Sequence, residues 1–195
     1  RLARAQTAVP AGADGMPGII IPRKTVGEIQ KLLDGADAAS TADIEISDTK
    51  IRVTFGSVVL TSKLIDGTFP DYARVIPQNN DKALKVDRAT FSNAVDRVST
   101  IASERGRAVK LSLSEDGRLS LTVNNPDSGS ATEEIDVDYQ QTALDIGFNS
   151  RYLLDIAGQL KTATALFRFA DPGSPTLIQD EGDDEALYVL MPMRV

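Results

Sequence analysis

The chain has 195 residues, a net charge of −7 and neither cysteine nor histidine, which excludes disulfides, thiol nucleophiles, Cys/His zinc sites and Ser-His-Asp triads. Taken alone, the negative charge argues against nucleic acid as a partner, although the position of charges matters more than their sum. With 42% apolar and only 5% aromatic residues, the chain can bury a core that is largely aliphatic. The apolar runs are too short to cross a bilayer and no signal peptide opens the chain, so we expect a cytoplasmic protein without a membrane partner.

The first predicted unit is a helix over residues 23–33 followed by strands. The apolar face of the helix consists of Val26, Ile29, Leu32 and Leu33, at helical spacing. Gly35 can end this helix. Strands are predicted over residues 44–46, 51–55 and 57–64. An Asp66-Gly67 turn then leads into an extended piece through Tyr72.

The second predicted unit begins with a helix over residues 88–103, which Asp87 or Thr90 can cap. Its apolar stripe consists of Phe91, Ala94, Val95, Val98 and Ile101. The turn signal Glu115-Asp116-Gly117 lies between two alternating segments. Strands are predicted over residues 109–113, 119–123, 134–138 and 142–146.

The third predicted unit begins with a helix over residues 150–160, with Asn149 as its N-cap. Its apolar face consists of Tyr152, Leu153, Ile156 and Leu160. Asp171-Pro172-Gly173 is a turn signal between two strands, and residues 180–185 form an acidic loop. Strands are predicted over residues 165–169, 176–179 and 186–193.

One helix and about four strands thus recur every 55 to 65 residues or so, which is the mark of an internal repeat. Helices on one side and antiparallel sheets on the other give an α+β fold class. We expect residues 77–195 to form a complete domain of two units and residues 1–76 to be part of another. The chain opens with Arg1 rather than Met, so we expect it to start within a fold.

The charges divide between helices and loops. Each predicted helix is net basic, whereas the acidic residues gather in strands and loops, as at 132–138 and 180–185. A helical face of this kind can lie beside phosphates without reading bases. Simple solvation of a mixed-charge helix face is the alternative.

Several motifs, spread in order along the chain, resemble bacterial DNA sliding clamps. Residues 61–72 read TSKLIDGTFPDY and residues 188–195 read YVLMPMRV, which resemble two patterns of that family. Asn124-Asn125-Pro126, Ile146-Gly147-Phe148-Asn149 and the Tyr152-Leu153-Leu154-Asp155 segment also match. The chain is similar to the C-terminal part of the beta subunit of the replicative DNA polymerase III holoenzyme.

The resemblance implies a homodimeric ring, when the protein is full length, with helices on the inner face around duplex DNA and sheets outside. Such a ring is a non-catalytic processivity factor that needs no cofactor or metal. The residues it places toward DNA, in a sequence-independent role, are Arg23, Lys24, Lys31 and Arg97. It places residues 1–76 in the middle clamp domain and 77–195 in the C-terminal one.

The resemblance also implies a peptide-binding groove for polymerase subunits, the clamp loader and repair proteins, which would present a short Gln/Leu/Phe motif. The matching residues are Arg1, Leu2, Pro70, Arg74, Val75, Asn149, Tyr152, Val189, Leu190, Met191, Pro192, Met193 and Arg194. Met, Val, Leu and Pro make an adaptable apolar floor. Without the resemblance, residues 189–193 would be read as a core strand. Gly173, Pro175 and Gly106 match the family's groove only loosely.

The ring interface implied by the family uses the end of the second helix and the acidic strand that follows. Thr100 and Ile101 are the candidates for apolar contact, and Glu133 and Glu134 for pairing with basic residues of the first domain.

Two other functions compete with the clamp. An enzyme could use Asp180, Asp183 and Asp184 as a metal site, but a solvated acidic loop is the simpler reading and no phosphate-binding glycine loop is present. A protein-interaction module that binds short linear peptides without touching DNA is the second alternative.

Overall fold

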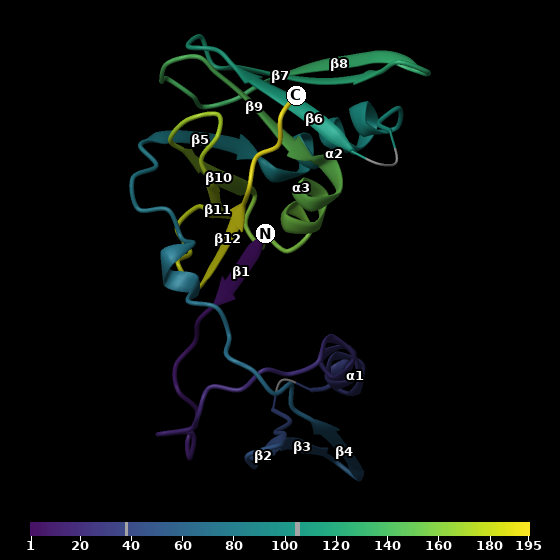
Figure 1. Ribbon diagram of the computed structural model, residues 1–195, viewed down its shortest axis with the longest axis vertical. Helices are drawn as coiled ribbons and strands as arrows, with labels where there is room; N and C mark the ends of the chain where they lie inside the picture. Colours follow the sequence, from purple (N-terminus) through teal and green to yellow (C-terminus); the bar gives the residue numbers. More distant parts are fainter. Residues whose placement is uncertain (38, 104–105) are drawn as a thin grey trace. The chain divides into compact units, whose positions relative to one another are not determined.

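The computed structural model describes residues 1–37, 39–103 and 106–195 (Figure 1). They divide into two compact units, which are described separately. Unit 1 comprises Arg1–Ala8 and Asp71–Val195, and unit 2 comprises Val9–Pro70. None of the helices in these ranges is long and apolar enough to cross a membrane.

Unit 2 contains helix α1 (Arg23–Leu33) and an antiparallel sheet in the order β2-β3-β4. The strands are β2 (Asp43–Ile46), β3 (Lys50–Phe55) and β4 (Val58–Lys63). A two-residue turn joins β3 to β4, and its first residue, Gly56, has φ of +58°, as a tight hairpin requires. Ile51 and Val53 are buried, and Thr25 of α1 shares a hydrogen bond of 2.7 Å with Ser62 of β4.

Unit 1 contains two antiparallel sheets and two α-helices. The five-stranded sheet has the order β1-β12-β11-β10-β5, and the four-stranded sheet has the order β8-β7-β6-β9. The strands are β1 (Leu2–Ala5), β5 (Lys82–Asp87), β6 (Ala108–Leu113), β7 (Arg118–Asn125), β8 (Gly129–Asp136), β9 (Leu144–Asn149), β10 (Thr164–Phe169), β11 (Thr176–Asp180) and β12 (Ala186–Leu190). The helices are α2 (Arg88–Ser99), α3 (Ser150–Ala157) and the short 3-10 helix η1 (Tyr72–Arg74).

One hydrophobic cluster joins the elements of unit 1. The helices α2 and α3 lie side by side, and α2 also contacts strands of both sheets (Figure 1). Phe91 of α2 meets Phe167 of β10 with ring centroids 5.1 Å apart, a separation typical of favourable aromatic pairs. Because the stripe of α2 and the inward residues of both sheets belong to this cluster, the α+β fold with antiparallel sheets predicted from the sequence is confirmed for unit 1.

Side-chain hydrogen bonds cap the first turns of α2 and α3. The Asp87 carboxylate accepts a hydrogen bond from the Thr90 amide at 2.7 Å, and Asn149 Oδ1 accepts one from the Tyr152 amide at 3.3 Å. Each bond satisfies an amide that has no partner within its helix. The capping roles predicted for Asp87 and Asn149 are confirmed.

The ends of several elements differ from the sequence predictions. Helix α2 ends at Ser99 rather than 103, where the Ser99 and Thr100 hydroxyls both donate to the Asp96 carbonyl and compete with the next backbone bonds. The extended piece predicted through Tyr72 is wrong, because Tyr72 begins η1. The final strand ends at Leu190 rather than 193, since Pro192 has no amide to donate to a ladder.

The strands β5 and β1 were not predicted. Strand β5 leads directly into α2 without a turn, and its apolar residues Leu84 and Val86 show the period of two that a strand requires. Strand β1 pairs with β12, so that Leu2 lies opposite Val189. The repeat therefore includes a strand before the helix, which a pattern beginning at the helix misses.

Candidate functional site

The C-terminal segment leaves one sheet of unit 1 and joins the other. After β12 ends at Leu190, the Met193 amide donates to the Gly147 carbonyl of β9 at 2.9 Å, forming an antiparallel bridge. Residues 191 and 192 therefore span from the five-stranded to the four-stranded sheet. This attachment fixes the position of Met193, one of the predicted groove residues, against β9.

Exposure divides the terminal residues into two groups. The side chains of Val189 and Leu190 are only 1% and 2% exposed, whereas Met191 is 52% exposed. Pro192 and Met193 are half-buried, and Arg194 is exposed. The first pair therefore supports the surface from within the core, and residues 191–194 are the ones that a ligand can reach.

A second group of predicted residues meets at α3. The Arg1 guanidinium lies 4.1 Å from the centre of the Tyr152 ring, a cation–π geometry, and pairs with the Asp155 carboxylate at 2.5 Å. Asn149 caps the same helix and its Nδ2 donates to the Gly106 carbonyl at 3.3 Å. Arg1, Asn149 and Tyr152 thus form a polar and aromatic surface, to which Asp155 also belongs. Asp155 lies in one of the motifs that resemble the family but was not predicted among the groove residues.

The remaining groove candidates lie near the start of unit 1 and the end of unit 2. Arg74 is exposed and pairs locally with Asp71 at 3.0 Å, and Val75 is exposed beside it. Leu2 is half-buried in β1. Pro70, the last residue of unit 2, is exposed. Leu2 lies opposite Val189 in the β1–β12 pair.

The basic residues predicted to face DNA differ in whether a nearby carboxylate forms an ion pair with them. Arg23 and Lys24 are exposed on the first turn of α1, and Lys31 pairs with Glu28 at 3.0 Å. Arg97 instead forms a double contact with Glu133 of β8, in which Nε lies 3.0 Å from Oε2. This hydrogen bond from Arg97 lowers the pKa of Glu133, so both groups are charged at neutral pH and largely cancel.

The residues predicted for a ring interface lie along α2's end and β8. The Thr100 hydroxyl donates to the Asp96 carbonyl, and Ile101 is half-buried against the core, where its carbonyl accepts a bond of 2.6 Å from Asn125. Glu134 lies 3.9 Å from Arg118. Strand β8 is the edge of its sheet as described, so its outer backbone groups can pair with another strand. The pairing of Glu133 with Arg97 is the contact that sequence reasoning missed.

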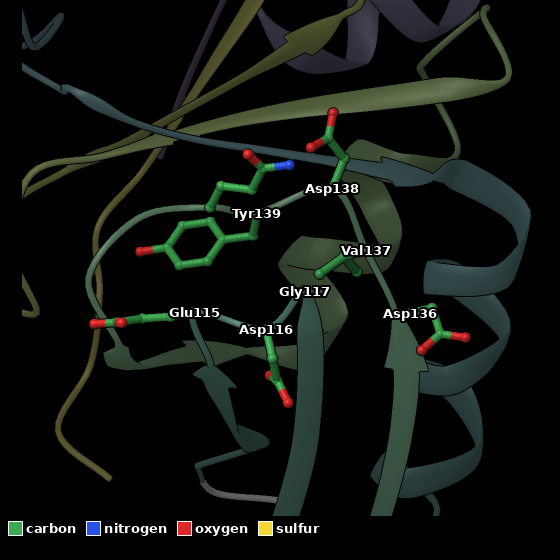
Figure 2. Close-up of a pocket in the computed structure, with 8 residues that line it drawn as sticks. Glu115, Asp116, Gly117, Asp136, Val137, Asp138 and Tyr139 are labelled. Carbon is green, nitrogen blue, oxygen red and sulfur yellow. The ribbon is translucent and has the colours of Figure 1, made fainter.

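An acidic cavity of about 600 Å³ lies beside the β6–β7 turn and is lined by Glu115, Asp116, Asp136 and Asp138. Figure 2 shows that these four carboxylates do not converge on one point. Within the described ranges, no three acidic residues are placed to hold a metal ion. The Ser114 hydroxyl lowers the pKa of Asp116, and burial raises the pKa of Tyr139, whose hydroxyl donates to the Thr142 carbonyl.

The acids of the competing enzyme hypothesis have structural partners. Asp180 is buried, and its carboxylate accepts from the amides of Lys161 and Thr162 and from the Thr162 hydroxyl at 2.7–2.9 Å. Asp183 accepts from the Glu185 amide, and Asp184 accepts from Gln179. The carboxylates of these three residues therefore accept hydrogen bonds that stabilise turns, and their arrangement is not typical of a metal site.

Sequence comparison places both halves of the chain in one family. Residues 73–194 match the C-terminal domain of the DNA polymerase III beta subunit, and residues 1–71 match its central domain. The fold agrees, because the sliding clamp from Bartonella birtlesii bound to griselimycin superimposes with a TM-score of 0.95 at 58% identity, covering 99% of this chain and 51% of that one. The structure is thus that of a DNA clamp.

The chain belongs to the DNA polymerase III beta subunit family. The beta sliding clamp of Caulobacter vibrioides is 52% identical over 195 residues, which are 100% of this chain and 52% of that protein. The beta sliding clamp of Escherichia coli K12 is 39% identical over 177 residues, 91% of this chain and 48% of that protein. The chain therefore spans about half the length of the curated relatives it matches.

Proposed function

We propose that this chain is the central and C-terminal part of a DNA polymerase processivity factor, a ring that encircles duplex DNA and tethers polymerases to it. The observation that carries the proposal is the match of two consecutive family domains, 1–71 and 73–194, in the order of the beta subunit. The proposed boundary between the clamp domains is at residues 76 and 77. In the complete protein the ring is a homodimer, and the clamp itself is non-catalytic.

The DNA-facing role rests on the exposed basic residues of α1. Arg23 and Lys24 can approach phosphates at small desolvation cost because they are exposed. Weak contacts of this kind suit a ring that must slide, since topology rather than affinity prevents dissociation. Lys31 and Arg97 contribute less, because Glu28 and Glu133 neutralise part of their charge.

The tethering role is supported by two groups of residues, 191–194 and Arg1, Asn149 and Tyr152, which we assign to one groove. Exposed Met191 offers an adaptable apolar contact, and Arg74 and Arg194 offer donors to a ligand backbone. Such a surface suits the Gln/Leu/Phe motif of polymerase subunits, the clamp loader and repair proteins. The clamps from Bartonella birtlesii and Pseudomonas aeruginosa have been solved with griselimycin bound, which supports a ligand site in the family.

The ring-interface role is proposed for Thr100, Ile101, Glu133 and Glu134 together with the free edge of β8. Because Glu133 already pairs with Arg97 within the chain, a basic residue from a partner would have to share or displace Arg97. Glu134, at 3.9 Å from Arg118, is less engaged and is the better candidate for an intermolecular ion pair.

A labelled Gln-Leu-x-Leu-Phe peptide tests the tethering role by fluorescence anisotropy. We expect a dissociation constant of roughly micromolar size, and we expect deletion of residues 193–195 to abolish binding. The matched control is Met16→Ala, which alters an exposed methionine of unit 2 and should leave the affinity unchanged. Binding that survives the deletion would refute the proposed site.

The alternative is a peptide-binding module that never meets DNA. A complete clamp carrying the Lys24→Glu and Arg97→Glu pair distinguishes the two, because charge reversal should impair loading or processive synthesis while peptide affinity stays unchanged. Processive synthesis that is unaffected by this pair would favour the alternative.

A further inference from the structure

Gly147 occupies an unexpected position on β9. In a strand, successive side chains point to opposite faces, and Leu144, Ile146 and Phe148 face the core, where all three are buried. Asp145 and Asn149 point the other way and are exposed and half-buried, respectively. Gly147 shares that outward face and yet is buried, so another segment covers it.

The covering segment is the C-terminus. A β-carbon placed on Gly147 would lie 2.6 Å from the Met193 carbonyl oxygen and 2.4 Å from Val195 Cγ1. Contacts below 3.0 Å are essentially never seen for a real β-carbon. The Val195 side chain can rotate, but the Met193 oxygen belongs to a backbone whose amide bonds Gly147 at 2.9 Å. An added methyl group therefore requires the segment itself to move.

The backbone conformation of Gly147 does not explain the glycine. Its φ lies outside the left-handed range that Gly117 adopts at +80°, and it pairs regularly with Lys110 of β6. Alanine therefore fits the strand, and the steric conflict that it creates is with residues 193–195. A glycine within a strand often marks such a close approach of another backbone.

We propose that Gly147 is a positioning residue, whose missing side chain seats residues 193–195 on the outer face of β9 and thereby fixes the orientation of Met191 and Pro192. The segment is held at both ends, because Leu190 pairs with Thr176 in one sheet and Met193 bonds Gly147 in the other. Without the second attachment, Met191 and Pro192 keep the attachment at Leu190 but lose the one at Met193. The functional consequence, weaker peptide binding, rests on the proposed function.

Methionine methyl NMR tests the seat without any ligand. The chain has three methionines, of which Met191 and Met193 lie in the segment and Met16 lies in unit 2. In Gly147→Ala we expect the methyl signals of Met191 and Met193 to shift and sharpen, while Met16 stays unchanged. We also expect the Met193 amide to lose its protection from hydrogen exchange. Unchanged Met193 signals in the folded variant would overturn the proposal.

A second variant covers the case in which Gly147→Ala does not fold. If the only conflict is with the segment, combining Gly147→Ala with deletion of residues 193–195 removes the opposing atoms and restores folding. A double variant that is also unfolded, when the deletion alone folds, would show that Gly147 is needed for another reason.

Peptide titration tests the functional consequence. We expect Gly147→Ala to weaken binding about tenfold or more. In the wild-type chain the segment is already ordered, whereas in the variant the ligand must immobilise it on binding, which costs affinity. The matched control is Gly158→Ala at the end of α3, where φ is −69° and the nearest atom to a β-carbon lies at 3.4 Å. Full affinity in a Gly147→Ala chain whose segment has moved would overturn the link to binding.

The two proposals fail in distinguishable ways. A wild-type chain that binds no peptide contradicts the tethering role, yet its methionine spectra still decide whether Gly147 seats the segment. A chain that binds peptide normally while Gly147→Ala leaves Met191 and Met193 unmoved contradicts the seat alone.

Discussion

Helices α1 and α2 have similar amphipathic patterns but very different surroundings. Phe91, Ala94, Val95 and Val98 of α2 are all at most 3% exposed. In α1, Val26 and Leu33 of the predicted apolar face are 49% and 41% exposed, and the buried side chain of the helix is Thr25. Periodicity therefore predicts which face of a helix is apolar, but the surrounding elements decide how much of it is covered.

The largest expected effect is Phe91→Ala in unit 1. Removing this buried ring deletes its contact with Phe167 and leaves a cavity, which costs about 3–5 kcal/mol in the free energy of unfolding. All four tyrosines, Tyr72, Tyr139, Tyr152 and Tyr188, belong to unit 1, so tyrosine near-UV circular dichroism follows its denaturation separately. A loss below about 0.5 kcal/mol, the usual size for a surface substitution, would contradict the single core of unit 1.

Asp180→Asn is expected to have the next largest effect. The carboxylate accepts bonds from Lys161 and Thr162 within the turn after α3, and bonds to a charged group contribute about 1.5–3 kcal/mol. The amide of asparagine presents one acceptor instead of two, so part of this stabilisation is lost. Thr176→Val in the same strand is the control, because the Thr176 hydroxyl is buried without a hydrogen-bond partner.

The pH dependence of this difference has a definite sign. Burial alone would raise the pKa of Asp180, but the bonds from Lys161 and Thr162 outweigh it, so its folded pKa is lowered from 3.8. The stabilisation is therefore fully present above the unfolded pKa and is lost as the pH falls through the folded value. Denaturation of wild type and Asp180→Asn should converge below pH 3.8; a gap that widens there would contradict the assignment.

Much of this architecture could be predicted from local chemistry. The bounds predicted for α1 are those observed, because a polar start, a regular apolar spacing and Gly35 after its end are all local signals. The caps Asp87 and Asn149 were predictable for the same reason. The α+β class followed from the alternation of helical and strand periods.

The features that could not be predicted depend on contacts distant in sequence. The pairing of β1 with β12 joins the two ends of the chain, and the Arg97–Glu133 pair joins α2 to β8. Of the groove candidates, the structure shows Arg1 beside Tyr152 and Met193 on β9, while membership of the others in one groove stays a prediction. Gly147 had a readable signal, a glycine in the interior of a strand, but its partner was not deducible.

Glu133→Gln tests whether the basic face of α2 differs from that of α1. Removing the carboxylate frees Arg97, so duplex DNA binding by a complete clamp should strengthen slightly, and the slope of log affinity against log salt should steepen by at most about 0.9. Glu115→Gln in the exposed β6–β7 turn is the matched control, because it removes the same charge from a residue outside the proposed DNA-facing and ring-interface sets. A steeper slope in the control but not in Glu133→Gln would contradict a role for Arg97 at DNA.

The smallest expected effect is Val26→Ala in α1, and its value lies in the comparison with Val95→Ala in α2. The same two methyl groups are removed, but Val95 is fully buried and should cost about 2 kcal/mol, whereas half-exposed Val26 should cost less than about 0.5 kcal/mol. The Met16 methyl signal reports unit 2, and tyrosine circular dichroism reports unit 1. If Val26→Ala destabilises unit 2 as much as Val95→Ala destabilises unit 1, then another surface covers Val26 in solution. The apolar face of α1 would then be as buried as that of α2, and the contrast between the two helices would be wrong.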